Sequence, residues 1–135
     1  MNITQEADYA VRAICILAKE GEGVKLDAKT IAERGSMPLR FLLKLLRKLI
    51  KAEIIKSYRG VNGGYALNKR REDINLRQVI EAVDGPIAIN RCLNDSDFCN
   101  ANNTDSCRIH YYLNKVQETL IKELEKISFE TLSNK

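Results

Sequence analysis

The stretch that decides the fold runs over residues 38–67 and reads PLRFLLKLLRKLIKAEIIKSYRGVNGGYAL. Its first half, residues 38–52, has the apolar spacing of a helix, and a proline fits the first position of a helix. Residues 54–58 then read as a strand, residues 61–64 as a turn with the Asn-Gly pair typical of hairpins, and residues 65–67 as a second strand. The stretch therefore predicts a helix followed by a two-stranded hairpin.

The predicted helix at 38–52 has an apolar side and a basic side. The side chains expected on its inner side are Leu39, Leu42, Leu43, Leu46, Leu49 and Ile50. The side chains expected mostly outward are Arg40, Lys44, Arg47, Lys48 and Lys51. This division predicts a helix that packs on a core and presents positive charge to its surroundings.

Positive charge is concentrated in this part of the chain. Residues 36–71 contain ten Lys or Arg residues and one acid, Glu53, whereas the rest of the chain has a net charge of −5. A basic stripe on a mildly acidic body is typical of proteins that bind a phosphate backbone. A solvated basic helix without a partner would have the same charge, so charge alone leaves both interpretations open.

The flanking segments predict three more helices: one that ends near Gly21, one at 28–34 and one at 76–83. A side chain that can cap a helix precedes each of them: Thr4, Asp27 and Asn75. Two helices, a basic helix and a hairpin, in this order, form a winged helix-turn-helix. We therefore expect a mainly α fold with a small β-hairpin wing over residues 1–85.

In this fold the third helix enters the major groove of DNA, and the wing can reach an adjacent minor groove. The expected partner is double-stranded DNA. The candidate DNA-binding residues are Pro38, Leu39, Arg40, Leu43, Lys44, Arg47, Lys48, Lys51, Arg59, Asn62, Gly63 and Tyr65.

Four residues with soft ligand atoms lie close together further along the chain: Cys92, Cys99, Cys107 and His110. Residues 90–106 lack an apolar period and are rich in Asn, Asp and Ser, so we expect a loop there. Thiolates bind both iron–sulfur clusters and zinc. Structural zinc sites usually contain a tight pair of cysteines, and here only Cys107 and His110 are that close. The residues alone leave an iron–sulfur cluster, zinc and no metal open, while Cys15, among apolar neighbours, is expected to be a buried small side chain.

After this loop, apolar residues recur at three- and four-residue steps from Ile109 to Ile127. The pattern predicts a long helix with one apolar stripe within residues 108–135. Packing against a second copy would bury the stripe, and a twofold dimer suits pseudo-palindromic half-sites in DNA. Folding back onto the first helix of the same chain is the alternative, and both can occur together.

The composition excludes several other classes of protein. The chain of 135 residues is 44% hydrophobic and 30% charged, as globular domains are. Glu6 and Asp8 argue against a secretory signal, and no apolar run approaches the length of a membrane span. We therefore expect a cytoplasmic protein without membrane contact. A single histidine and the lack of a second set of catalytic groups argue against an enzyme or an electron carrier.

Five features in this order resemble the IscR/NsrR-type family of bacterial winged-helix transcription regulators. They are Ala7–Val11, the passage from Leu42 to Ile55, the wing from Arg59 to Tyr65, the stretch Val79–Gly85 and the loop with three cysteines. The resemblance covers nearly the whole chain. It implies a homodimer with crossed C-terminal helices and an iron–sulfur cluster held in the cysteine loop.

The resemblance implies Cys92, Cys99 and Cys107 as cluster ligands and offers two candidates for the fourth. His110 would complete the three-cysteine, one-histidine set of the branch concerned with iron–sulfur biogenesis, which holds a 2Fe–2S cluster. Asp8 would match the aspartate with which the nitric-oxide-sensing branch completes a 4Fe–4S cluster across the dimer. We favour His110 and a 2Fe–2S cluster because this histidine lies one helical turn beyond Cys107.

The sequence thus predicts three parts: a winged helix-turn-helix at 1–85, a cluster-binding loop at 86–107 and a dimerisation helix at 108–135. The expected function is sequence-specific transcription regulation, with operator binding modulated by an iron–sulfur cluster that senses iron–sulfur status, redox state or nitric oxide. The alternative is a cluster-free or zinc-bearing winged-helix regulator that responds to a metabolite or a protein partner.

Overall fold

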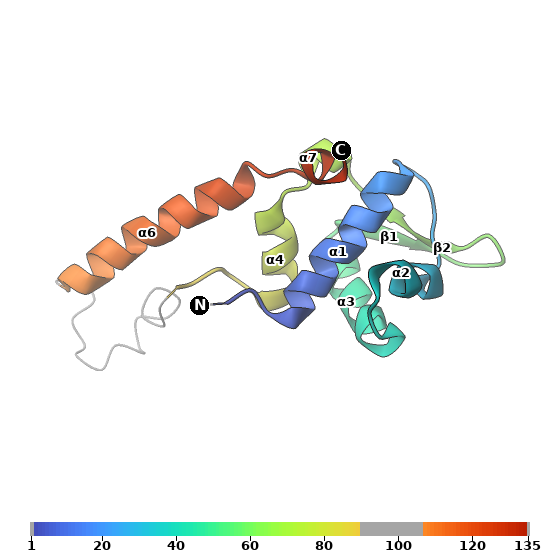
Figure 1. Cartoon of the computed structure of the whole chain (residues 1–135), viewed down its shortest axis with the longest axis horizontal. Helices are drawn as coiled ribbons and strands as arrows, with labels where there is room; N and C mark the ends of the chain where they lie inside the picture. Colours follow the sequence, from blue (N-terminus) through green and yellow to red (C-terminus); the bar gives the residue numbers. More distant parts are fainter. Residues whose placement is uncertain (1, 90–106, 135) are drawn as a thin grey trace.

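The computed structural model describes residues 2–89 and 107–134. These residues form a mainly helical structure with one antiparallel two-stranded hairpin (Figure 1). The elements, in chain order, are α1 (Gln5–Glu20), α2 (Ala28–Gly35), α3 (Leu39–Lys51), β1 (Ile55–Tyr58), β2 (Gly64–Leu67), the 3₁₀ turn η1 (Arg71–Asp73), α4 (Leu76–Asp84), α6 (Arg108–Glu125) and α7 (Phe129–Ser133). The winged-helix architecture predicted from the sequence is confirmed.

The three helix caps expected from the sequence are present. The Thr4 hydroxyl accepts a hydrogen bond from the Ala7 N–H, and the Asp27 carboxylate accepts one from the Thr30 N–H. Asn75 begins α4 with a reciprocal capping box, in which its side chain and that of a glutamine three residues later each bond the other's backbone N–H. These bonds satisfy backbone donors that the first turn of a helix leaves free, and they fix where each helix begins.

Helix α1 lies at the centre of the winged domain (α1–α4 with the hairpin) and packs against α2, α3, α4 and α7. The largest fully buried side chains come from all of these elements and from β1: Ile14, Leu17, Ile31, Leu42, Leu45, Leu46, Leu49, Ile54, Ile55, Ile74, Val79 and Phe129. Gly35, at the end of α2, allows close approach to α1, because a Cβ there would lie 3.2 Å from Cδ1 of Ile16 in α1. The carbonyl of Gly35 instead accepts a hydrogen bond from Arg12 of α1 at 2.7 Å.

The inner face of α3 differs in part from the expectation. Its buried residues are Leu42, Leu45, Leu46 and Leu49. Leu39 and Leu43, which we expected on the inner side, are 42% and 37% exposed. The prediction was wrong for these two residues because they form an i, i+4 row beside the buried stripe rather than within it. Together with Phe41, which is 51% exposed, they make three apolar side chains that α3 presents beside its basic ones.

The wing is a regular hairpin in which Ile55 pairs with Leu67 and Tyr58 with Gly64. Its turn closes with a hydrogen bond of 3.0 Å from the Gly63 N–H to the Gly60 carbonyl. Gly64 has a φ of +150°, and a Cβ there would lie 2.7 Å from the backbone oxygen of Leu26. Glycine is required at this position because the segment before α2 pairs with β2 there.

The C-terminal part differs from the single long helix that we expected. Helix α6 ends at Glu125, and the chain then turns into the short helix α7, whose first residue, Phe129, is fully buried in the core of the winged domain. Two backbone hydrogen bonds fix this return, from the Phe129 N–H to the Ile74 carbonyl (2.9 Å) and from the Leu76 N–H to the Ile127 carbonyl (3.0 Å). Ile127 therefore belongs to the connection and not to the stripe of α6.

The two halves of α6 have different surroundings. Leu120, Ile121 and Leu124 in the second half pack against a small cluster formed by Ala7, Ile80 and Ile87. The first half extends away from the winged domain (Figure 1), and its apolar side chains Ile109, Tyr111, Tyr112 and Val116 are exposed. The second half thus folds back onto its own chain, as one of the two alternatives expected. Among the described helices, none is long and apolar enough to cross a membrane.

Candidate functional site

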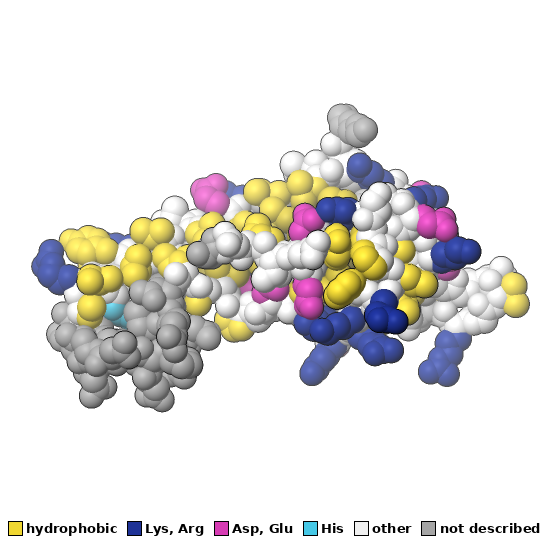
Figure 2. All heavy atoms as spheres, turned by 60° about the horizontal axis from the view of Figure 1, so that its bottom comes forward, with side chains coloured by type: hydrophobic (Ala, Val, Ile, Leu, Met, Phe, Trp, Pro, Cys, Tyr) yellow, Lys and Arg dark blue, Asp and Glu magenta, His cyan; other side chains and the backbone are white. Residues whose placement is uncertain are grey.

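Helix α3 carries a row of basic side chains on the side opposite its buried leucines. Arg40, Lys44, Arg47 and Lys51 are exposed, and the period of 3.6 residues places them on one face. In Figure 2, Lys and Arg side chains gather along one edge of the winged domain. Pro38 lies at the N-cap of α3 rather than at its first helical position, and it is exposed.

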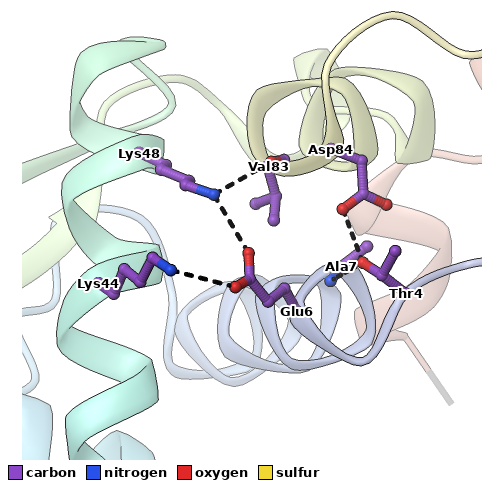
Figure 3. A network of polar contacts seen from close by, with 7 residues as sticks. All are labelled: Thr4, Glu6, Ala7, Lys44, Lys48, Val83 and Asp84. Carbon is purple, nitrogen blue, oxygen red and sulfur yellow. Dashed lines mark hydrogen bonds and ion pairs between the residues drawn. The ribbon is translucent and has the colours of Figure 1, made fainter.

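Lys48 lies beside this row and is only half-exposed, and its ammonium group, like that of Lys44, points toward Glu6 of α1 (Figure 3). Its Nζ lies 3.1 Å from Oε2 of Glu6 and donates to the carbonyl of Val83 at 3.3 Å. Lys44 reaches the same carboxylate, with its Nζ 3.5 Å from Oε1 of Glu6. The hydrogen bond from Lys48 is the main reason that the pKa of Glu6 lies below its ordinary value, while desolvation opposes this shift. The sequence offered no signal for these two contacts, because Glu6 is 38 positions from Lys44 and 42 positions from Lys48.

The wing contributes polar and basic side chains at its outer end. Arg59 and Asn62 are exposed, as a role in DNA binding requires. Gly63 and Tyr65 are half-buried: Gly63 closes the turn, and Tyr65 packs on the core while its backbone pairs with Leu26. Sequence reasoning missed Lys25, whose Nζ lies 4.2 Å from the ring centroid of Tyr58 in a cation–π contact. Lys25 therefore adds a positive charge beside the end of β1 that leads into the turn of the wing.

Of the cysteine-loop residues, the structure describes Cys107 and His110. Cys107 is a free thiol at the N-cap of α6, and His110 lies in the first turn of that helix, three residues later. Cys92 and Cys99 lie outside the described residues. Within residues 2–89 and 107–134, no three His, Cys, Asp or Glu side chains are grouped so that they could hold a metal ion.

Asp8, the alternative fourth ligand, and Cys15, which is not expected to bind the cluster, both lie on α1. Asp8 is exposed and forms an ion pair with Arg12, one helical turn later, at 2.6 Å. Cys15 is half-buried against the core rather than fully buried, and this burial raises the pKa of its thiol. A thiol with a raised pKa is a poorer source of the thiolate that metals bind.

The fold and the basic face of α3 define a winged-helix DNA-binding protein. The family model described as Rrf2, iron-dependent transcriptional regulator, matches residues 3–135. An rrf2-like HTH-type transcriptional regulator of Rhodobacter capsulatus is 33% identical over 136 residues, which cover 96% of this chain and 91% of the relative. An HTH-type transcriptional regulator of Haemophilus influenzae is 31% identical over 135 residues, which cover 100% of this chain and 88% of the relative. The chain belongs to the Rrf2 family.

Solved structures agree with this assignment. CymR, the global cysteine regulator of B. subtilis, superposes with a TM-score of 0.77 and 24% identity over 98% of this chain and 96% of that one, a likeness that shows the fold. T. potens IscR superposes with a TM-score of 0.69 and 25% identity over 98% of this chain and 85% of that one. The protein is therefore a transcriptional regulator with a DNA-binding winged helix, and its family consists of regulators rather than enzymes.

Proposed function

We propose that this protein is a dimeric, sequence-specific DNA-binding regulator whose operator affinity is set by an iron–sulfur cluster. The observation that carries the DNA-binding part is the exposed basic face of α3 beside the wing. Arg40 lies in the first turn of α3, the part that meets base edges in this class of fold. An arginine there can bond both acceptors of a guanine, whereas Lys51 in the last turn is better placed for a phosphate.

The proposed dimer rests on the first half of α6. Its exposed apolar stripe is formed by Ile109, Tyr112 and Val116, which recur at three- and four-residue steps, and Tyr112 is in edge-to-face contact with Tyr111 beside the stripe. A contiguous apolar surface of this kind on a helix that extends from the body is typical of a protein–protein contact. A second copy in twofold symmetry would bury both stripes at once and would present two α3 helices to the half-sites of a pseudo-palindromic operator.

The proposed cluster rests on the chemistry of its donors. Cys107 and His110 supply a thiolate and an imidazole within one helical turn at the start of α6, and Cys92 and Cys99 are the further thiolate donors. This set suits a 2Fe–2S cluster, with Asp8 and a 4Fe–4S cluster as the variant. Such a cluster would supply a centre that reacts with oxygen or nitric oxide and that is lost when iron is scarce.

The chain around the cysteine loop suggests how occupancy could reach the DNA-binding surface. Before the loop, the Ile89 N–H donates to Gln117 of α6 (3.0 Å), and the Ile87 N–H donates to Glu81 of α4 (2.9 Å). After the loop, Cys107 begins α6. The chain on either side of residues 90–106 is thus attached to α4 or α6, so a cluster bound there would bias the spacing of the two winged domains.

A second candidate function is a cluster-free regulator that responds to a small apolar metabolite. A cleft of about 270 Å³ favours it, lined by the N-terminal residues, the end of α4 and the inner side of α6, including Ile3, Ile80 and Leu120. Most pockets for small molecules are somewhat larger than this cleft. The cluster experiment below separates the two candidates.

The DNA-binding proposal is tested with an operator selected from a random duplex library. Arg40→Ala should weaken operator binding by about 1–3 kcal/mol if the arginine contacts a base. Lys51→Ala should weaken binding to all sequences and reduce the salt slope by about 1. Lys122→Ala, an exposed lysine on α6, is the control and should bind like the wild type. Equal affinity of the wild type for operator and random DNA at every salt concentration would refute the proposal.

The cluster proposal is tested on protein purified without oxygen, by absorbance and by iron and sulfide content. Cys92→Ser, Cys99→Ser and Cys107→Ser should each lose the cluster, whereas Cys15→Ser should keep it. His110→Ala should change the spectrum more than Asp8→Ala if the cluster is 2Fe–2S. Holo- and apo-protein should differ by about 5–150-fold in operator affinity, the usual scale of such coupling. If the purified protein contains no iron or sulfide and its cysteine variants bind the operator like the wild type, the cluster-free regulator is favoured.

A further inference from the structure

Three helices of the winged domain meet at the first turn of α1 in a polar network (Figure 3). Thr4, the cap of α1, donates its hydroxyl to Oδ1 of Asp84, the last residue of α4, at 2.6 Å. Two residues later, Glu6 receives the ammonium groups of Lys44 and Lys48 from α3. The network therefore ties the DNA-facing helix to the start of α1 and to the end of α4, from which the chain continues toward the cysteine loop.

The two lysines are held to different degrees. Lys48 has two acceptors, Glu6 at 3.1 Å and the Val83 carbonyl at 3.3 Å, and its side chain is 36% exposed. Lys44 has one longer contact, at 3.5 Å to Glu6, and its side chain is 60% exposed. The Val83 carbonyl belongs to the last turn of α4, where the helix dipole is negative and adds to the attraction for an ammonium group. Lys48 is thus anchored, and Lys44 can exchange its partner.

A DNA phosphate and the Glu6 carboxylate compete for the same ammonium groups. Each is an anion that accepts charge-assisted hydrogen bonds, and binding of a phosphate by a lysine releases a counterion from DNA whatever the base sequence. An acid beside two lysines of α3 therefore reduces the sequence-independent part of the binding free energy. The contacts to bases, which arginines of α3 can make, are unaffected by this competition.

We infer that Glu6 is a specificity-determining residue, which withholds Lys48 from DNA, weakens the hold of phosphate on Lys44 and so limits binding to random sequences. The inference rests on the proposed DNA binding by α3. It assigns Lys48, one of the candidate DNA-binding residues, a positioning role toward α1 and α4.

The test measures binding to a random-sequence duplex between 50 and 200 mM salt for the wild type and for Glu6→Gln. The variant keeps the size of the side chain but removes its charge, so both lysines become available to phosphate. For each lysine released, the salt slope should steepen by about 0.9, which corresponds to about 3.5-fold over this range. Random-sequence affinity should rise at low salt, and the ratio of operator to random affinity should fall.

Glu20→Gln is the matched control. It removes the same charge from the same helix, but Glu20 pairs with Arg34 of α2 and not with α3. Its salt slope should stay close to that of the wild type apart from the general effect of one negative charge. Thermal unfolding of each variant shows that it is folded. Equal slopes for Glu6→Gln and Glu20→Gln would overturn the inference.

A double-mutant cycle gives an independent measurement. Lys48→Met keeps the aliphatic stem and removes the charge. In the wild type it should change random-sequence affinity by less than about twofold, because Glu6 and Val83 already hold this ammonium group. In the Glu6→Gln background it should reverse part of the gain in affinity and flatten the slope. An identical effect of Lys48→Met in both backgrounds would overturn the inference.

The result also separates this inference from the proposed function. If the wild type prefers the operator but the salt slope of Glu6→Gln is unchanged, only the proposed role of Glu6 is refuted. Wild-type protein that does not discriminate the operator refutes sequence-specific binding, and with it any specificity role for Glu6.

Discussion

Neighbouring basic residues of α3 meet different partners. Arg47 is exposed to solvent, whereas the next residue, Lys48, bonds an acid of α1 and a carbonyl of α4. Helical periodicity places both on the polar side, but a lysine has a long flexible stem that lets its ammonium group reach a partner beside the face. Individual contacts, rather than the count of positive charges, therefore decide which residues are available to DNA.

The lowered pKa of Glu6 predicts a pH dependence of stability. A carboxyl whose pKa is lower in the folded protein than its ordinary value of 4.5 stabilises the fold above that value, and the contribution is lost as the pH falls through the lowered value. Wild-type protein should therefore lose more stability than Glu6→Gln between about pH 6 and pH 3. The difference should be at most about 1 kcal/mol, because the pair is partly solvated.

The measurement is the thermal unfolding midpoint of both proteins at several pH values. The advantage of the wild type should be greatest near neutral pH and should shrink below about pH 4. A constant difference between the two proteins across this range would show that the ion pair does not contribute to stability.

The short helix α7, at the end of the described chain, completes the core. Helix α7 has five residues, too few to be stable alone, yet Phe129 is fully buried between elements of the winged domain. Ser128 caps the helix through a hydrogen bond from the Thr131 N–H and forms an isolated bridge with Asn75. Helix α7 therefore exists because of its contacts with the rest of the protein.

Phe129→Ala should lower the free energy of unfolding by about 3–5 kcal/mol, the usual cost of removing a buried phenylalanine. Val61→Ala is the control, because Val61 is fully exposed at the tip of the wing, and its substitution should change stability by less than about 0.5 kcal/mol. Urea denaturation followed by circular dichroism measures both. A loss below about 1 kcal/mol for Phe129→Ala would mean that α7 does not dock as described.

The two halves of α6 differ in what they contact. The second half packs on α1 and α4, and the first half leaves an apolar stripe exposed. This stripe is the surface on which the proposed dimer depends. The winged domain does not need it, because the core of that domain is formed by α1–α4, the hairpin and α7.

Replacement of both Ile109 and Val116 by Asp should therefore produce a folded monomer. Two charges in an apolar contact would each lose hydration without gaining a partner, which costs several kcal/mol. Light scattering after gel filtration measures the mass, and unchanged thermal unfolding of the winged domain shows that the fold is intact. Glu118→Gln, on the polar side of the same helix, is the control and should leave the mass unchanged. A double variant that keeps the mass of the wild type would place the proposed contact elsewhere.

The order of elements, the three caps and the wing could be predicted from the sequence, because each depends on residues close together in the chain. Hydrophobic period, capping side chains such as Thr4 and the Asn-Gly turn act within a few residues. The basic face of α3 followed from the same period. The cysteine spacing likewise pointed to a candidate ligand set, of which Cys107 is the N-cap of α6 and His110 lies in the first turn of that helix.

Contacts between distant parts of the chain could not be predicted from local sequence patterns. The exposure of Leu39 and Leu43, the docking of Phe129 and the ion pairs of Glu6 depend on which elements meet in space. No local pattern encodes these tertiary contacts, because the partners are separated by tens of residues and are brought together by burial of the shared core. Local patterns therefore placed the basic side chains on one helix, and the packing of α1 and α4 against α3 brought the ammonium group of Lys48 to Glu6 and to the Val83 carbonyl.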